Sequence, residues 1–331
     1  MKLLKIFMSI CLVLFCTFTF MYGRNLINSE SNVVKSEEFQ GVISLWQIDG
    51  FEGGVGSRKQ FLLKIARQFE KENSGVLIMV TNMSKKGAEE NIQNGILPDM
   101  ISFSNGIDLR GMTELNTDRK SVGGVVGNVS YAVAWCRGGY VLIENPKYVN
   151  KDKKYEFVLV SQGEYTQPIL AMCLEELKFN DIEILSPMNA YVKFVSGKSR
   201  YLLGTQRDVN RLKAREMTVN CTPFVEYNDL YQYVLVSSKD PLKQFYSGKF
   251  IDFLLSEKCQ KELYNIGMMS CFFDVKFEND HLNQMQMIKN NYTLSAFTHS
   301  AYLKELQNLS QSWVSGSDNV ENKIKKMLIK S

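Results

Sequence analysis

The chain has 331 residues, of which 45% are hydrophobic and 22% are charged, and this length suits two domains of average size. The net charge is +4, from 39 basic and 35 acidic residues without a basic block, so the composition gives no electrostatic case for nucleic-acid binding. A mean hydropathy of −0.17 excludes a polytopic membrane protein.

Residues 1–23 differ from the rest of the chain. Two early lysines precede an uncharged apolar run over 7–22, which is typical of a secretory signal and is also near the lower length limit of a spanning helix. The end of the run is a poor cleavage site, and Val13–Cys16 lacks the small residues of a lipoprotein box. A cleaved signal peptide and a retained N-terminal membrane anchor therefore stay open as alternatives. In both cases we expect an extracytoplasmic protein, either secreted or anchored at the outer face of the cytoplasmic membrane.

Seven cysteines are present, and two of them belong to the N-terminal apolar run. The other five are widely spaced and resemble neither a disulfide framework nor a zinc site. They are Cys136, Cys173, Cys221, Cys259 and Cys271. We expect mostly buried thiols. An oxidising compartment would allow one bridge, for example between Cys221 and Cys271.

After a polar tether over 24–40, strands and helices alternate. Ser57 begins a helix, and Gln60 completes a capping box with it. One face of that helix carries Phe61, Leu62, Ile65, Ala66 and Phe69. Compact apolar strands are expected at 42–48, 76–80 and 99–103, with a second helix over 84–94. This β-α-β-α-β order predicts a mostly parallel sheet with helices on both faces.

Further along, apolar segments predict more strands at 125–135, 157–160, 201–203 and 231–236. Helical patterns lie between them, at 167–177, 190–195 and 209–216. From Pro241 the chain is expected to be helical to its end, except around 267–273. The pattern therefore continues as α/β and closes with a helical region.

Several short motifs then occur in a familiar order. They are Leu45–Gly54 before a helix, Leu97–Phe103, Tyr131–Trp135, Phe194–Lys198 followed by Tyr201–Gly204, and Phe250–Leu255. Together they resemble the extracellular solute-binding proteins of ATP-binding-cassette (ABC) importers, particularly the carbohydrate-type family 1. The resemblance spans about residues 42–272. Each motif alone is weak, and their order and spacing carry the comparison.

The resemblance implies an α/β protein with the two-lobed architecture of type II periplasmic-binding proteins. Each lobe would be a mostly parallel sheet flanked by helices, and crossing strands would join the lobes. Residues 41–130 would form lobe 1, and 131–235 would form lobe 2 with crossing segments at both ends. Residues 236–331 would be a C-terminal helical part that packs on the lobes.

The resemblance also implies a receptor that closes on a small ligand and delivers it to the transmembrane permease subunits of an ABC importer. A carbohydrate is the first choice of ligand, and a small anion is the second because of Arg58, Arg137 and Arg207. The runner-up is a membrane-tethered ligand sensor or interaction module with the same fold. We expect no cofactor and no bound metal.

The first candidate binding loop follows the first strand, at the carboxyl end where open parallel sheets bind ligands. Its glycines allow backbone N–H groups to approach a ligand, and the helix after it directs a positive dipole end to the same place. Trp46 or Trp135 could stack on a sugar face. The candidate residues of this region are Trp46, Asp49, Glu52, Gly53, Gly54, Ser57, Arg58, Ser104 and Trp135. The alternative is a tight strand-to-helix turn with Trp46 in the core.

The second candidate loop is Gly204–Asp208, where Thr205, Gln206 and Arg207 concentrate donors and acceptors between a strand and a helix. Arg207 suits a bidentate contact with a ligand. Asp208 could equally be a helix N-cap, with Arg207 as its intramolecular partner. Tyr227 and Asp229 either line the cleft from lobe 2 or are strand-edge residues.

Catalysis is not expected. The chain has only two histidines, both outside the glycine-rich loops, which disfavours a histidine-dependent triad or metal site. Cys136 beside Arg137 has no positioned base within the motif. Asp49 and Glu52 lie on one loop, whereas the carboxylates of a glycoside hydrolase flank the bond that they cut. A secreted hydrolase is therefore only the third hypothesis.

Overall fold

The computed structural model describes residues 39–51, 54–109, 111–148, 157–317 and 319–330. The expected signal or anchor and nearly all of the expected tether lie outside these residues. The chain divides into a unit at Met1–Gly41 and a second unit at Val42–Ser331, and the description below concerns the second. In the described part of the chain, we find no helix with both the length and the apolar character needed to cross a membrane.

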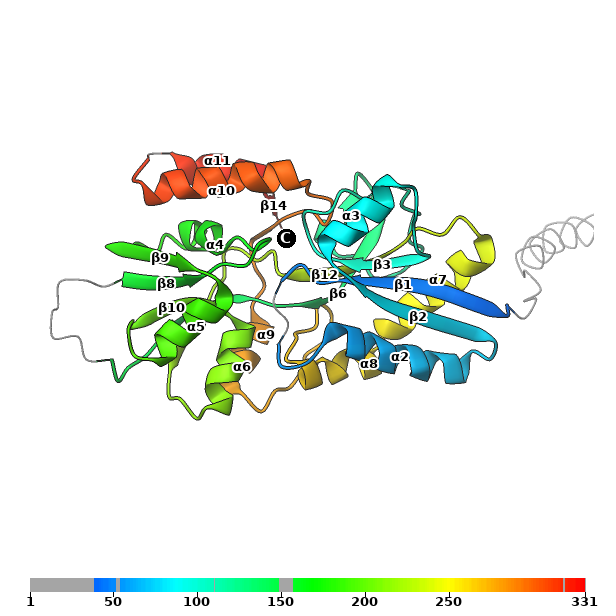
Figure 1. Ribbon diagram of the computed structural model, residues 1–331, viewed down its shortest axis with the longest axis horizontal. Helices are drawn as coiled ribbons and strands as arrows, with labels where there is room; N and C mark the ends of the chain where they lie inside the picture. Colours follow the sequence, from blue (N-terminus) through cyan, green and yellow to red (C-terminus); the bar gives the residue numbers. More distant parts are fainter. Residues whose placement is uncertain (1–38, 52–53, 110, 149–156, 318, 331) are drawn as a thin grey trace, which may run out of the picture. The chain divides into compact units, whose positions relative to one another are not determined.

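The first sheet has five strands in the order β2-β1-β3-β12-β6 (Figure 1). Their bounds are β1 Gly41–Ile48, β2 Val76–Met83, β3 Met100–Phe103, β12 Tyr231–Val236 and β6 Ala132–Arg137. Strands β1 and β3 are parallel, and β12 runs antiparallel to both β3 and β6. The helices of this lobe are α2 Arg58–Glu72, α3 Lys85–Gln93, α7 Pro241–Leu254 and α8 Glu257–Lys261. This is lobe 1.

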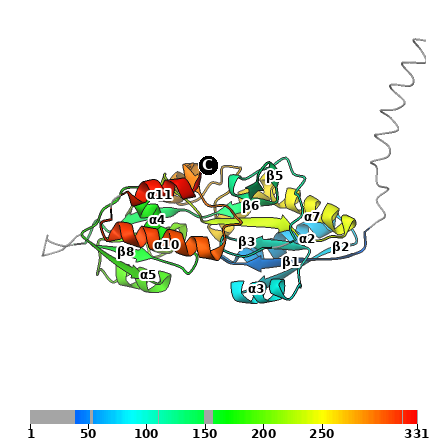
Figure 2. The ribbon, with the colours of Figure 1, turned by 90° about the horizontal axis from the view of Figure 1, so that it is seen from above.

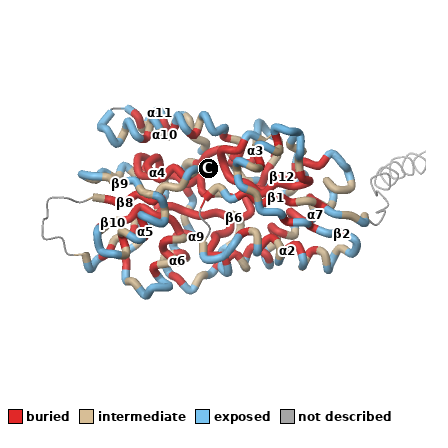
Figure 3. Tube along the Cα trace, viewed as in Figure 1, coloured by how far each residue is buried: buried red, intermediate tan, exposed pale blue. Residues whose placement is uncertain are grey.

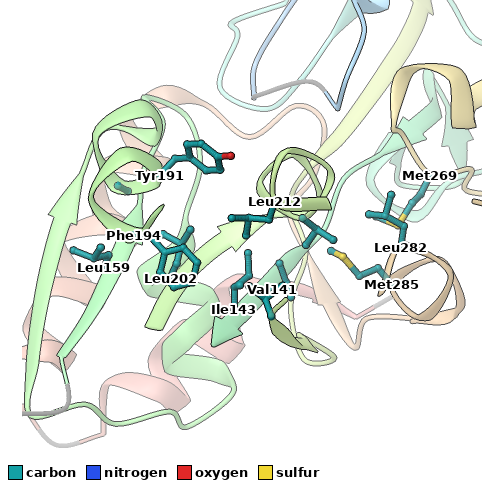
Figure 4. Close-up of a cluster of buried hydrophobic side chains, with 13 residues drawn as sticks. Val141, Ile143, Leu159, Tyr191, Phe194, Leu202, Leu212, Met269, Leu282 and Met285 are labelled. Carbon is teal, nitrogen blue, oxygen red and sulfur yellow. The ribbon is translucent and has the colours of Figure 1, made fainter. Parts of the chain in front are cut away.

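The second sheet has the order β11-β7-β10-β8-β9. Its strands are β7 Tyr140–Glu144, β8 Phe157–Ser161, β9 Asp181–Leu185, β10 Tyr201–Thr205 and β11 Asn220–Pro223. Strand β8 is parallel to β9 and β10, and β7 is antiparallel to β10 and β11. The helices are α4 Pro168–Leu174, α5 Pro187–Val195 and α6 Gln206–Ala214. This is lobe 2, and its core is shown in Figure 4.

The two-lobed α/β architecture is confirmed, but the sheets are mixed rather than mostly parallel. The reason is visible in lobe 1. The chain leaves that lobe along β6 and returns along β12, so β12 enters the sheet against the direction of β3. The strands that connect the lobes are therefore also strands of the first sheet.

The C-terminal part, residues 236–331, packs against both lobes. Helices α7 and α8 belong to lobe 1, α9 (Asp280–Met287) packs against α6, and α10 (Ser300–Val314) packs against α4 and α11 (Val320–Met327). Figure 2 shows α10 and α11 beside α4. The remaining short elements are η1 Val122–Gly124, β4 Val125–Val126, β5 Val129–Ser130, η2 Glu262–Ile266, β13 Tyr292–Thr293 and β14 Ile329–Lys330.

Helix α2 begins where its sequence predicts. Ser57 is its N-cap, and the Ser57 hydroxyl accepts a hydrogen bond from the backbone N–H of Gln60 at 3.4 Å. The five predicted apolar residues of this helix are all buried. Phe61 among them stacks on Trp135 of β6, with ring centroids 5.7 Å apart. The buried tube in Figure 3 follows the strands and the inward faces of the helices.

Candidate ligand-binding site

A cavity of about 310 Å³ lies between the loop after β1 in lobe 1 and the loop after β8 in lobe 2. Its walls come from the carboxyl ends of strands in both lobes, which is the usual position of ligands in open α/β sheets. Asp49, Gly50, Phe51, Gly56 and Arg58 line it from lobe 1, and Gly163, Glu164 and Tyr165 line it from lobe 2. We take this cavity as the candidate ligand-binding site.

Arg58 organises the lobe 1 wall. Its side chain is 2% exposed, and its Nε lies 2.8 Å from Asp49 Oδ1. Its Nη1 donates to Gln232 Oε1 at 3.1 Å, and its Nη2 donates to the carbonyl of Phe51. The guanidinium also lies 4.4 Å from the centroid of the Phe51 ring. Arg58 is thus committed to the protein and fixes the loop after β1.

The Asp49 carboxylate is the polar group that this arrangement leaves accessible in the cavity. Its side chain is 47% exposed, and Asp49 Oδ1 also accepts a hydrogen bond from Gln47 Nε2 at 3.0 Å. Since Arg58 and Gln47 hold one carboxylate oxygen, the orientation of the group is set before a ligand arrives. A pre-oriented carboxylate beside the Phe51 ring suits a polar ligand with an apolar face.

The two lobes touch at the edge of the cavity. Lys85, in the first turn of α3, places its Nζ 3.9 Å from the centroid of the Tyr165 ring in lobe 2. Burial lowers the pKa of Lys85, and the carboxylates of Glu89 and Glu164 act in the opposite direction. Burial also raises the pKa of Tyr165. The contact therefore joins a partly desolvated ammonium to an aromatic ring across the cleft.

A buried polar cluster lies where the crossing strands meet the lobes. The Tyr140 hydroxyl donates to Asp229 Oδ1 at 2.7 Å, and it accepts a hydrogen bond from the backbone N–H of Gln167 at 2.8 Å. Asn105 Nδ2 donates to the carbonyl oxygen of Asp229 at 3.2 Å. Tyr227 stacks on Tyr140 with centroids 6.5 Å apart. Asn105 follows β3, while Tyr140 and Gln167 belong to lobe 2, so the cluster connects both lobes.

This interlobe cluster leaves some of its buried polar atoms unpaired. Two of them, Asn105 Oδ1 and Gln167 Nε2, make no hydrogen bond with the described residues. Burial raises the pKa of Asp229 to about 7, while the side chains of Tyr140 and Tyr227 act in the opposite direction. An unpaired buried polar atom costs about 1–3 kcal/mol. Unpaired buried atoms of this kind call for an explanation, and a functional role is one.

The two tryptophans are not where a sugar-stacking role needs them. Trp135 is fully buried, and its Nε1 donates to Ser102 Oγ at 3.0 Å. Trp46 is 9% exposed and packs in the apolar core of lobe 1. The stacking hypothesis is therefore wrong for both, because the core of lobe 1 buries their rings. For Trp46 the alternative of a core position describes the structure.

The glycine-rich loop serves packing at its described positions. A Cβ on Gly54 would lie 2.1 Å from the carbonyl oxygen of Ile266, and a Cβ on Gly50 would lie 2.2 Å from Ser104 Cβ. Val55 donates to that same Ile266 carbonyl at 3.0 Å. The loop thus lies directly on the turn after η2. Glu52 and Gly53 lie outside the described residues.

The second candidate loop is mainly a scaffold. Thr205 and Asp208 form a capping box on α6, in which Asp208 is the third helical residue rather than the N-cap. Gln206 is fully buried, and its Oε1 accepts from the backbone N–H of Gly139 at 3.1 Å. Arg207 is half-buried, and burial lowers its pKa. These residues hold α6 against the crossing segment and do not line the cavity.

Sequence reasoning missed the lobe 2 wall and Lys85. Gly163, Glu164 and Tyr165 lie between strand β8 and the Pro168 that opens α4. A polar loop between an apolar strand and a helix start was the signal used for Gly204–Asp208, and it could have identified this loop too. Nothing in the sequence around Lys85 indicates that it reaches the other lobe.

The five cysteines of the described part are free thiols, so the bridge allowed between Cys221 and Cys271 is not formed. Burial raises the pKa of Cys136 well above its ordinary value, which makes it a poor nucleophile. Across the described ranges, no group of three or more His, Cys, Asp or Glu side chains is placed to hold a metal ion.

No protein-family model matches the sequence, and no curated protein matches it either. Solved structures do match. The sugar-binding protein MalE from Xanthomonas citri has a TM-score of 0.61 and 13% identity over 87% of this chain and 95% of that chain. The maltose/maltodextrin-binding domain MalE from Bdellovibrio bacteriovorus, bound to maltotriose, has a TM-score of 0.53 and 13% identity over 87% and 97%.

Iron-bound HitA from Pseudomonas aeruginosa matches with a TM-score of 0.53 and 13% identity, over 81% of this chain and 99% of that chain. At this level of identity the likeness concerns the fold, and it extends over nearly the whole length of each matched chain. The chain therefore has the two-lobed α/β fold of the periplasmic solute-binding proteins.

Proposed function

We propose that the protein is a non-enzymatic, extracytoplasmic solute-binding receptor that captures a carbohydrate between its lobes and delivers it to the permease of an ABC importer. The observation that carries this proposal is the cavity whose walls come from strand ends of both lobes. A ligand in contact with both walls stabilises the closed arrangement by its greater affinity for it.

The chemistry of the walls favours a neutral, hydroxyl-rich ligand. Asp49 and Glu164 supply carboxylates that accept hydrogen bonds from hydroxyl groups, and Tyr165 supplies a ring for the C–H face of a sugar. The charge of Arg58 is already matched by Asp49. The cavity is lined by two carboxylates and by one cation that is already paired, so it would repel a small anion, which is the second choice of ligand from the sequence. Some of the matched structures also bind sugars.

Isothermal titration with maltotriose, xylotriose and a panel of monosaccharides tests the binding. We expect Asp49→Ala and Tyr165→Ala to weaken the affinity for the bound sugar by about tenfold or more, as loss of a charged hydrogen bond or a stacking ring does. Tyr264→Ala is the matched control, because Tyr264 is 52% exposed and does not line the cavity. Absence of binding across the panel, or cavity variants that behave like the control, would contradict the proposal.

Delivery needs a separate test in cells. Deletion of the gene should abolish uptake of the sugar identified by titration, and the parent protein should restore uptake while Asp49→Ala should not. Binding in vitro together with unchanged uptake in the deletion strain would refute delivery and favour the alternative of a sensor.

A further inference from the structure

A second cavity, of about 490 Å³, lies where the segments that connect the two lobes meet. Its lining residues are Arg137, Tyr231, Ser270–Asp274 and Gln286–Asn290. Arg137 ends β6 and Tyr231 begins β12, so both crossing strands contribute to it. It shares no lining residue with the candidate ligand-binding site. Its volume is in the range of about 300–1,000 Å³ that is usual for small-molecule sites.

Arg137 gives this crossing-segment cavity its charge. The residue is 7% exposed, its Nε donates to the carbonyl of Ser270 at 3.3 Å, and its Nη2 donates to the carbonyls of Gln286 at 2.7 Å and Ile288 at 3.2 Å. No carboxylate among the described residues forms an ion pair with it, and its Nη1 makes no hydrogen bond within the described ranges. Because Arg137 lines the cavity, its Nη1 remains available to donate a hydrogen bond to a ligand there.

The other walls combine polar and apolar side chains. Tyr231, Phe272 and Phe273 contribute aromatic rings, and the Arg119 guanidinium lies 5.4 Å from the centroid of the Phe272 ring and 4.5 Å from that of the Phe273 ring. Lys289 adds a second cation to the lining, whereas Asp274 is the one carboxylate among the lining residues. Two cations against a single carboxylate leave the lining with a net positive charge. A monoanion fits this balance better than a dianion, which Asp274 would repel.

We propose that the crossing-segment cavity binds a small organic monocarboxylate with an aromatic or aliphatic body. The carboxylate would accept hydrogen bonds from Arg137 Nη1 and the Lys289 ammonium, and the body would lie against Phe272 and Phe273. Charge-assisted hydrogen bonds of this kind are stronger than neutral ones, and low exposure increases this effect for Arg137, whereas Lys289 is exposed. Such a ligand would contact the crossing strands, so its site is distinct in place and chemistry from the carbohydrate site.

Titration calorimetry with benzoate, 4-phenylbutyrate, indole-3-acetate and hexanoate tests the proposal, with 4-phenylbutanol as the uncharged counterpart. We expect at least one acid to bind in a 1:1 complex and the alcohol to bind at least about tenfold more weakly, which corresponds to about 1.4 kcal/mol. No binding by any acid at millimolar concentration would overturn the proposal, as would equal binding of the acid and the alcohol.

Variants locate the site. Lys289→Gln and Phe273→Ala should each weaken binding of the acid by about tenfold, since a single charged contact or aromatic wall is worth that much. Lys276→Gln, an exposed lysine outside the lining, and Asp49→Ala in the other cavity should leave it unchanged. Replacement of Arg137 is avoided because Arg137 also holds the end of α9. If Asp49→Ala abolishes acid binding while Lys289→Gln does not, the acid occupies the carbohydrate site and this inference is wrong.

Discussion

The most specific stability prediction concerns the replacement of Asp229. Burial raises its pKa to about 7 from a reference value of 3.8. Its Oδ1 accepts a hydrogen bond from Tyr140, and the side chain of Tyr227 also lowers its pKa, but desolvation is the larger effect. Above pH 7 the folded protein therefore holds a buried carboxylate whose desolvation these contacts do not fully offset. A difference of about three pH units corresponds to about 4 kcal/mol, as an order of magnitude.

The sign follows from proton linkage. Because the pKa of Asp229 is higher in the folded state than in the unfolded state, the folded state binds the proton more tightly between about pH 4 and pH 7. The free-energy cost of burying Asp229 is therefore smallest below pH 4, and it grows as the pH rises to 7. Asp229→Asn removes the charge and keeps the oxygen that Tyr140 binds. We expect the variant to be more stable than the parent at pH 8, by up to about 4 kcal/mol.

Urea unfolding of the ligand-free protein at pH 5 and pH 8 measures this effect. The advantage of Asp229→Asn in free energy of unfolding should be clearly smaller at pH 5. Asp118→Asn, at an exposed position, is the control and should change the free energy of unfolding little at either pH. A variant less stable than the parent at pH 8, or an advantage of equal size at both pH values, would refute the reasoning about the buried charge.

Three further predictions concern the packing and the thiols. Trp135→Ala should lower the free energy of unfolding by about 3–5 kcal/mol in urea titrations, because it empties a core position; unchanged stability with lost ligand affinity would instead restore the stacking role. Gly54→Ala should lower the free energy of unfolding by about 1–3 kcal/mol in the same assay, because the new Cβ would lie 2.1 Å from a backbone oxygen. Gly248→Ala is the matched control: it lies in a helix with open space around it, and it should raise the free energy of unfolding by about 0.5–1 kcal/mol. Burial raises the pKa of Cys271 to about 12, so iodoacetamide at pH 8 should label this thiol slowly in the native protein. In urea without reductant, mass spectrometry should find both Cys221 and Cys271 labelled, because both are free thiols. Failure to label both in urea would show that a disulfide joins them.

Local patterns predicted the elements well where the signal is itself local. Helix α2 has its cap at Ser57 and its apolar face inward because a 3.6-residue period and a capping serine act within a few turns. Strand β12 also lies where an apolar run predicted it, and Asp49 follows the carboxyl end of β1 and lines the cavity. Only the lobe 1 wall of the cavity contains residues named from the sequence, because the predicted lobe 2 loop at Gly204–Asp208 does not line it.

The roles of individual side chains could not be predicted, because they depend on contacts far apart in the sequence. Trp135 looked available for a ligand until the fold placed Phe61 and Ser102 against it. Gly54 was expected to let the backbone approach a ligand, whereas its lack of a Cβ admits the backbone of Ile266. The sequence also could not show that Arg58 would be neutralised by Asp49 on the same loop.

The contacts across the cleft show what closure costs and what a ligand must supply. Lys85 is partly desolvated where it meets Tyr165, and Asp229 is desolvated beside Tyr140. Opening of the lobes would let water reach groups such as Lys85, so their burial favours the open arrangement in the absence of ligand. A ligand rich in hydroxyl groups could donate to Asp49 of lobe 1 and to Glu164 of lobe 2 at once, because both carboxylates line the cavity. Under the proposed function, closure would depend on the ligand, because the bound carbohydrate would pair polar groups that closure takes from water.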